Sequence, residues 1–219
     1  MSENRWKQPM PFGWRVQPDG VVHADMPQGA LLMEDSFAQA GELVATVTVH
    51  RAATNPTFWR TVGIALWQDE RYHWRLNLVE APENLQYRHA AELHEMYNGV
   101  WLAGGQSETR LTVKEEYSQP GWTWQYGKPY RLRLVWSAQS IRGEVYEGET
   151  LCWAYEWLLD NPKAVRAGYL GLTCNWFDAT FSQVETRHLV AAQPPQPEPK
   201  RIPPYRVQHV GRKVAEPAG

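Results

Sequence analysis

Between residues 42 and 50 the chain reads ELVATVTVH, in which apolar and polar side chains alternate. In an extended strand Leu43, Ala45, Val47 and Val49 would share one face and His50 would lie on the other. A second stretch, YRLRLVWS at 130–137, repeats the alternation with arginines as the polar partners. This period of two is typical of half-buried antiparallel strands and not of amphipathic helices.

The same alternation recurs along most of the chain, and short turn sequences interrupt it. We expect further strands at 71–79, 109–114 and 140–146. More than ten strands predict two packed sheets, because one open sheet of that size would leave a face uncovered. The predicted fold class is therefore all-β, a two-sheet antiparallel β-sandwich. Only 156–167, which contains Asn161-Pro162, is predicted to form a helical turn or a long loop.

The 219 residues are enough for one large domain, which we place at 12–190 after an N-terminal extension at 1–11. Residues 191–219 are rich in proline and basic side chains, which predicts an extended tail. We expect this tail to wrap its own domain or to be disordered, and not to bind a polyanion.

The charge balance argues against a nucleic-acid partner, since 22 Lys and Arg face 24 Asp and Glu. No apolar run approaches the length needed to span a bilayer, and residues 1–5 contain no hydrophobic signal core, so a soluble protein is expected. Its location would be cytoplasmic, or secreted or periplasmic if a signal peptide was removed. Oligomeric state cannot be predicted from these features.

Composition also limits the cofactors. Cys152 and Cys174 are too few for a disulfide scaffold or a four-cysteine zinc site, so we interpret them as packing residues. No cofactor is predicted, and a structural calcium ion is left open. The 12 Trp and 10 Tyr against 5 Phe favour a wide sandwich or a sugar-binding face, because these rings carry a polar group.

Several segments together resemble the concanavalin A-like lectin/glucanase superfamily, especially its laminin-G-like and keto-disaccharide-hydrolase-like bacterial members. They are GVVHA at 20–24, GALLM at 29–33, the stretch at 42–50, VGIALW at 62–67 leading to RYHWR at 71–75, GKPYRLRL at 127–134, and GYLGL at 168–172 before ATFSQV at 179–184. The resemblance covers roughly residues 12–190 and implies a jelly roll whose concave face usually holds carbohydrate. The paired-acid motif Glu-x-Asp-x-x-Glu of the glucanases is absent, so their retaining mechanism is not supported.

Two neighbouring predicted strands carry unusual polar sets. His73, Arg75 and Asn77 would share one face of the first strand. On the next, 86–97, the corresponding face would carry Arg88, Glu92 and His94. If the strands pair, the six residues form one patch, although a plain solvent-facing sheet would also be polar. The aromatic residues predicted to stack on sugar rings beside this patch are Trp67, Tyr97 and Trp101.

We therefore predict a carbohydrate-active protein that cleaves a glycosidic bond, as a hydrolase or a lyase. The predicted catalytic residues are His73, Glu92 and His94, with Glu95 or Glu115 as a possible second acid. The substrate, a poly- or oligosaccharide, would contact Arg75, Asn77, Arg88 and the three aromatic residues. Glu92 and His94 alone are too few for a metal site. The alternatives are a non-catalytic carbohydrate-binding module and a structural or partner-binding domain.

Overall fold

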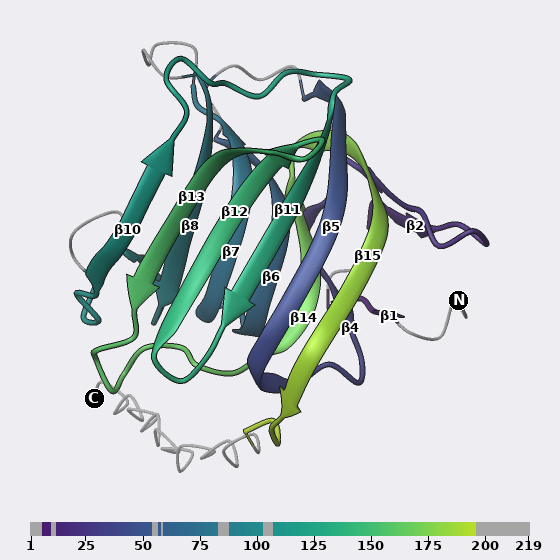
Figure 1. Ribbon diagram of the computed structural model, residues 1–219. Helices are drawn as coiled ribbons and strands as arrows, with labels where there is room; N and C mark the ends of the chain where they lie inside the picture. The colour runs from purple at the N-terminus through teal and green to yellow at the C-terminus, as the bar shows by residue number, and fades with distance from the viewer. Residues whose placement is uncertain are drawn as a thin grey trace, which may run out of the picture.

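Two antiparallel β-sheets pack face to face in the computed structural model, which describes residues 6–9, 12–53, 57, 59–82, 88–102 and 107–195. The predicted all-β sandwich is confirmed. In Figure 1 the larger sheet lies in front of the smaller one.

The smaller sheet, sheet A, has seven strands in the described part of the chain. In spatial order they are β1 (Trp6–Lys7), β4 (Gln28–Met33), β14 (Tyr169–Asn175), β6 (Arg60–Asp69), β7 (Tyr72–Glu80), β8 (His89–Tyr97) and β9 (Val100–Trp101). Sheet B has eight strands within the described ranges: β10 (Thr112–Ser118), β13 (Thr150–Leu158), β12 (Ser140–Glu147), β11 (Pro129–Trp136), β5 (Ala38–Ala52), β15 (Phe177–Ala191), β3 (Val22–Asp25) and β2 (Trp14–Val16).

Large apolar and aromatic side chains fill the space between the sheets. Those that are almost fully buried include Trp74, Trp124, Tyr130, Trp136, Phe177 and Phe181. Two of the indoles satisfy their polar edge there, because Trp74 Nε1 donates to the carbonyl of Val165 and Trp124 Nε1 to that of Val79, both at 2.9 Å. Each buried side chain of this size stabilises the fold by roughly 1.5–3 kcal/mol or more, so the alternating pattern is sufficient to bring the two sheets together.

The strands lie close to where alternation predicts them. The stretch 42–50 falls inside β5, and 130–137 corresponds to β11. The strand expected at 109–114 instead begins at Thr112, because Thr109 hydrogen-bonds to Ser107 in a buried loop. The predicted helical turn or loop at 156–167 is a loop after β13 ends at Leu158. No helix in the described residues is long and apolar enough to cross a membrane.

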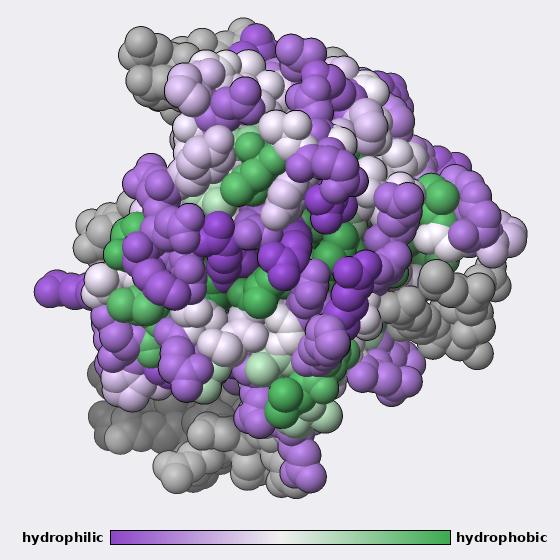
Figure 2. Space-filling model, viewed as in Figure 1, coloured by the Kyte–Doolittle hydropathy of each residue, from purple (hydrophilic) through white to green (hydrophobic). Residues whose placement is uncertain are grey.

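The outward face of sheet B is covered mainly by hydrophilic side chains (Figure 2). A row of ion pairs crosses it: Arg133 bonds both Glu42 at 2.8 Å and Glu144 at 2.7 Å, and Arg142 bonds Glu144 at 2.7 Å. These charges neutralise one another, so this row does not form an excess of either sign. The domain boundary predicted near residue 190 lies next to the end of β15, and residues 196–219 of the predicted tail are outside the described residues.

Candidate functional site

Five of the six predicted polar residues lie on the outward face of sheet A. The β7–β8 register sets Arg75 opposite His94 and Asn77 opposite Glu92. His73 lies one row further along β7, opposite Met96. Because alternate residues of a strand share a face, these five side chains form one surface, which we call the polar face: His73, Arg75, Asn77, Glu92 and His94.

The expectation that Arg88 joins this face is wrong. β8 begins only at His89, so Arg88 precedes the ladder. Its Nε and Nη2 donate to Glu80 Oε1 at 2.9 and 2.8 Å. Glu80 is 1% exposed, and its buried carboxylate attracts the guanidinium away from the polar face.

Tyr97 lies on the opposite side of the sheet from Trp67 and Trp101, which also contradicts the predicted aromatic surface. It is one residue out of phase with Met96, pairs with Tyr72 and contacts its ring edge-on at 5.2 Å. Both tyrosines pack against the core.

The two proposed second acids also lie elsewhere. Glu95 is fully buried, stands opposite Trp74 in the β7–β8 ladder and accepts a hydrogen bond from the Val165 amide at 2.6 Å. Glu115 bonds Arg142 of sheet B. Neither residue can pair with Glu92 across a substrate on the polar face.

An aromatic cage holds the first two residues of the polar face. The His73 imidazole stacks on Trp67 with ring centroids 4.2 Å apart and an interplanar angle of 9°. Arg75 Cζ lies 5.1 Å from the Trp67 ring centroid and 5.4 Å from that of Trp101. Trp67 is only 5% exposed, so its main contacts are with its protein neighbours, and Trp101 is the more accessible ring.

Burial sets the protonation of this cage. It lowers the pKa of His73 to about 3, with a further contribution from the charge of Arg75. Burial also lowers the pKa of Arg75 to about 10, against the opposing effect of Glu92. At neutral pH the cage therefore holds a neutral imidazole and a guanidinium that keeps its charge.

A chain of weak hydrogen bonds organises the other half of the polar face. Thr173 Oγ1 donates to Asn77 Oδ1 at 3.3 Å, and Asn77 Nδ2 donates to Glu92 Oε1 at 3.4 Å. Burial raises the pKa of Glu92, although Asn77 and Arg75 oppose the shift. Burial lowers the pKa of His94, whose Nε2 lies 4.0 Å from Glu92 Oε2, to about 4. The pair thus combines a carboxyl that retains its proton to higher pH with a neutral imidazole.

Beside the polar face is a hollow of about 210 Å³ on the same side of sheet A. Gly29 and Ala30 of β4 line it, and their small size leaves room for it. The lining residues are Pro9, Gln28, Gly29, Ala30, Trp67, Glu70, Arg75 and Asn175. The sequence patterns did not indicate this hollow or the residues Gln28, Glu70 and Asn175 that line it.

The Asn175 amide at this hollow is held in place by hydrogen bonds to the two strands beside β14. Its Nδ2 donates to Thr61 Oγ1 at 3.0 Å, and its Oδ1 accepts from the Gly29 amide at 3.1 Å. The hollow therefore combines a fixed amide, the Arg75 cation, the Glu70 carboxyl and the edge of an indole. Such convergent polar groups beside apolar surface are typical of small-ligand sites.

The fold is shared with several solved structures. Carbohydrate binding module CBM66 from Bacillus subtilis aligns with a TM-score of 0.54 and 13% identity, covering 84% of this chain and 96% of that one. A xylan beta-1,4-xylosidase from Bacillus halodurans aligns with a TM-score of 0.56 and 12% identity, covering 86% of this chain and 37% of that one. A functionally unknown protein from Saccharomyces cerevisiae aligns with a TM-score of 0.52 and 14% identity, covering 85% of this chain and 96% of that one.

No family model and no curated protein matches the chain. Identities of 12–14% show a common β-sandwich and nothing about activity. Membership of the concanavalin A-like superfamily therefore stays a prediction from the sequence. Within the described ranges, no three His, Cys, Asp or Glu side chains form a group that could hold a metal ion.

Proposed function

We propose that this protein binds carbohydrate on the outward face of sheet A, with one sugar ring in the hollow beside Trp67 and Arg75. The observation that carries the proposal is the hollow itself, where rigid polar groups converge over small residues on a sheet face. Sugar hydroxyls both donate and accept hydrogen bonds, which matches the Arg75 guanidinium, the Asn175 amide and the Glu70 carboxyl. The sandwich shared with a carbohydrate binding module supports this choice.

The neighbouring polar face would contact the next ring of a longer sugar. Glu92 and His94 retain partial exposure, with 29% and 24% of their side chains accessible, whereas His73 and Asn77 are 1% exposed. We therefore assign direct contact to Arg75, Glu92 and His94, and a positioning role to His73 and Asn77. Trp101, which is partly exposed, is the aromatic surface that a sugar ring would reach.

Replacing Arg75 by methionine tests this proposal. We expect at least a tenfold loss of affinity for a bound mono- or disaccharide, because a central interface arginine typically contributes more than 1 kcal/mol. Isothermal titration calorimetry against a glycan panel measures the loss. The matched control is Arg131→Met, since Arg131 Cζ also lies over an aromatic ring, that of Tyr146 at 4.2 Å, but on sheet B. Equal affinities for both variants would contradict the proposed site.

Cleavage of a glycosidic bond is the second candidate function, and the raised pKa of Glu92 favours it. A carboxyl that holds its proton above the ordinary range can act as a general acid toward a leaving oxygen. The neutral His94 beside it could accept a proton, which would suit β-elimination. Because Glu95 and Glu115 point elsewhere, a two-carboxylate hydrolase is the less favoured form of this chemistry.

If the protein is an enzyme, Glu92→Gln should lower turnover by about 10²–10⁴-fold, the usual contribution of a general acid. Turnover of the wild type should fall as pH rises through the pKa of Glu92, which burial raises above the ordinary value for glutamate. Reducing ends and unsaturated uronates are the products to measure. Equal rates for both proteins would remove Glu92 from the mechanism, and no product from either, on a glycan that binds, would leave binding as the function.

A further inference from the structure

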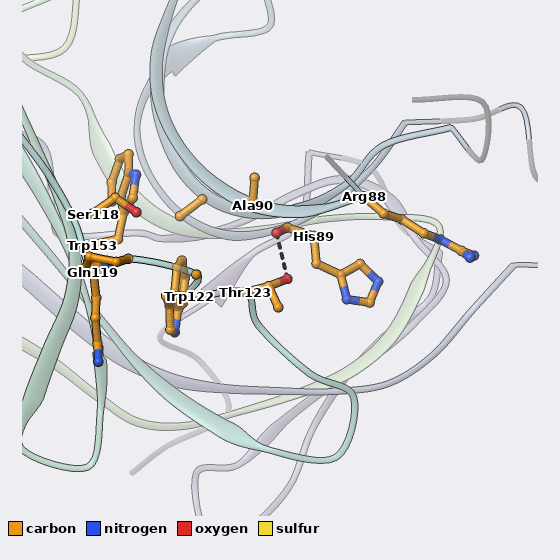
Figure 3. Close-up of a pocket in the computed structure, with 11 residues that line it drawn as sticks. Arg88, His89, Ala90, Ser118, Gln119, Trp122, Thr123 and Trp153 are labelled. Atoms are coloured by element: carbon orange, nitrogen blue, oxygen red, sulfur yellow. Dashed lines mark hydrogen bonds between the residues drawn. The ribbon is translucent and has the colours of Figure 1, made fainter. Parts of the chain in front are cut away.

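A larger cleft opens where the edges of the two sheets meet, away from the polar face. It measures about 710 Å³ and lies between the start of β8 and the turn that follows β10. Figure 3 shows Trp122, Trp153, Ser118 and Gln119 gathered on one side of it, and Arg88 on the other. This volume is in the range of small-molecule binding sites, so the cleft is large enough to hold a ligand.

A tight turn divides this cleft from a second hollow. The amide of Trp122 donates to the carbonyl of Gln119 at 3.0 Å, and Gly121 has a φ of +72°, as expected for a type II turn with proline in its second position. Residues 119–122 line the cleft and also a hollow of about 360 Å³ toward Thr150. We call the two together the edge cleft. The partly exposed Trp122 indole therefore borders open space on both sides of the turn.

The charged groups of the edge cleft are compensated within the protein. Arg88 bonds the Glu80 carboxylate at 2.8 Å, and Glu147 bonds Lys128 Nζ at 2.5 Å. The remaining polar lining consists of His89, whose Nδ1 bonds the carbonyl of Trp124 at 2.9 Å, and of hydroxyl and amide side chains: Ser118, Gln119, Thr123 and Thr150. Such a lining favours an uncharged ligand with many hydroxyl groups.

An extended peptide fits the edge cleft less well. β9 pairs with β8 only at Met96 and Tyr97, so the preceding part of β8 has no further strand beside it among the described residues. Two carbonyls of β8 already accept side-chain hydrogen bonds, that of His89 from Thr123 at 2.9 Å and that of Leu93 from Trp157 at 2.8 Å. An added strand would have to displace both donors to form a regular ladder.

We propose that the edge cleft is a second binding site, for a linear uncharged oligosaccharide whose rings stack against Trp122. This inference rests on the proposed function, since it assumes a carbohydrate ligand. It extends that function because the hollow on sheet A has room for about one ring, whereas the edge cleft is several times larger. Affinity should then increase with chain length, and the increase should depend on Trp122.

The test measures affinity by calorimetry for β-1,4-xylan and β-1,4-glucan fragments, from monosaccharide to hexasaccharide. Trp122→Ala should weaken binding of the hexasaccharide roughly tenfold and leave the monosaccharide unchanged. Because Trp122 also packs edge-on against Tyr130, Ser118→Trp serves as a second variant that fills the cleft without removing a core contact, and it should have the same effect. Tyr117→Ala, an exposed aromatic of β10 that lines neither hollow, is the control.

The outcomes separate the two proposals. In one outcome, Arg75→Met abolishes binding while Trp122→Ala and Ser118→Trp keep wild-type affinity at every chain length. This result would overturn the proposal of a site in the edge cleft and support the sheet A site. If only the cleft variants lose affinity, the cleft is supported and the sheet A site is overturned. A wild type that binds no glycan overturns both, and displacement of a bound hexasaccharide by extended peptides overturns the assignment of the cleft to sugars.

Discussion

Replacing Glu80 by glutamine is expected to lower the free energy of unfolding by about 3–5 kcal/mol, because the buried Arg60 guanidinium then faces a neutral amide in place of a carboxylate. Glu80 and Arg60 have 1% and 4% of their side chains exposed and lie 2.9 Å apart. Glutamine keeps the shape of glutamate but not its charge. The exposed Arg88 contributes little to the loss, since water already screens it. At roughly 2–4 °C per kcal/mol the melting temperature should fall by about 6–20 °C.

Two further variants make this prediction specific. Glu185→Gln removes a carboxylate from an exposed pair with Arg187 and should change stability by less than about 0.5 kcal/mol. The double variant Glu80→Gln with Arg60→Met should recover part of the loss, because the buried charge of Arg60 is then removed as well. A Glu80→Gln protein as stable as Glu185→Gln would show that the ion pair is not buried as described.

The stability that Glu80 contributes should also depend on pH. Burial opposes its ionisation, but hydrogen bonds from Tyr126 and Arg88 and the charge of Arg60 outweigh burial and hold its pKa below the ordinary value for glutamate. A depressed carboxyl pKa stabilises the fold above the unfolded-state value, and this stability is lost as pH falls through the folded-state value. The wild type should therefore lose stability below about pH 4.5, and Glu80→Gln should lack that component.

This ion pair also bears on the edge cleft. Tyr126 donates its hydroxyl to Glu80, and His89 stacks on Trp124 with ring centroids 4.0 Å apart. Both aromatic residues follow the turn at 119–122 in the sequence. The Glu80 carboxylate thus links the segment that follows the 119–122 turn to the end of β7. Removing this link should lower the affinity for any ligand that contacts Trp122.

Alternation in the sequence was enough to find the strands and most of the polar face. His73, Arg75 and Asn77 have the same parity in β7, and a short connection made pairing with Glu92 and His94 the simplest topology. The prediction for Tyr97 was wrong because this residue is the last of β8, where a shift of one residue exchanges the two faces of the sheet. Arg88 failed because its position depends on Glu80, a buried partner that strand periodicity does not reveal.

The edge cleft could not be predicted in the same way. Its lining combines Ala90 of sheet A with Trp153 of sheet B, which are far apart in the sequence and meet only because the sheets stack. Periodicity within one strand says which side chains share a face, but not which residues of the other sheet lie opposite. The hollow on sheet A could not be predicted either, because its lining residues come from separate parts of the chain, at 9, 28–30, 67–75 and 175.

Gly63→Ala is expected to destabilise the protein by about 4 kcal/mol or more, because the added methyl group would strike backbone. A Cβ at position 63 would lie 1.9 Å from the carbonyl oxygen of Leu76 and 2.9 Å from Cα of Asn77. Neither atom can move without separating β6 from β7, which pair along most of their length. Thermal or denaturant unfolding measures the loss.

Gly143→Ala on sheet B is the matched control. Its Cβ would meet the Leu76 Cδ1 atom at 2.8 Å and Leu93 Cδ2 at 3.4 Å, the ends of side chains that can rotate, so a loss of about 1–3 kcal/mol is expected. Neither glycine has a positive φ, so backbone strain does not distinguish them. Equal losses would mean that β6 and β7 approach less closely than described. Gly63→Ala should also weaken sugar binding. Separating β6 from β7 would displace Asn77, whose hydrogen bond orients Glu92.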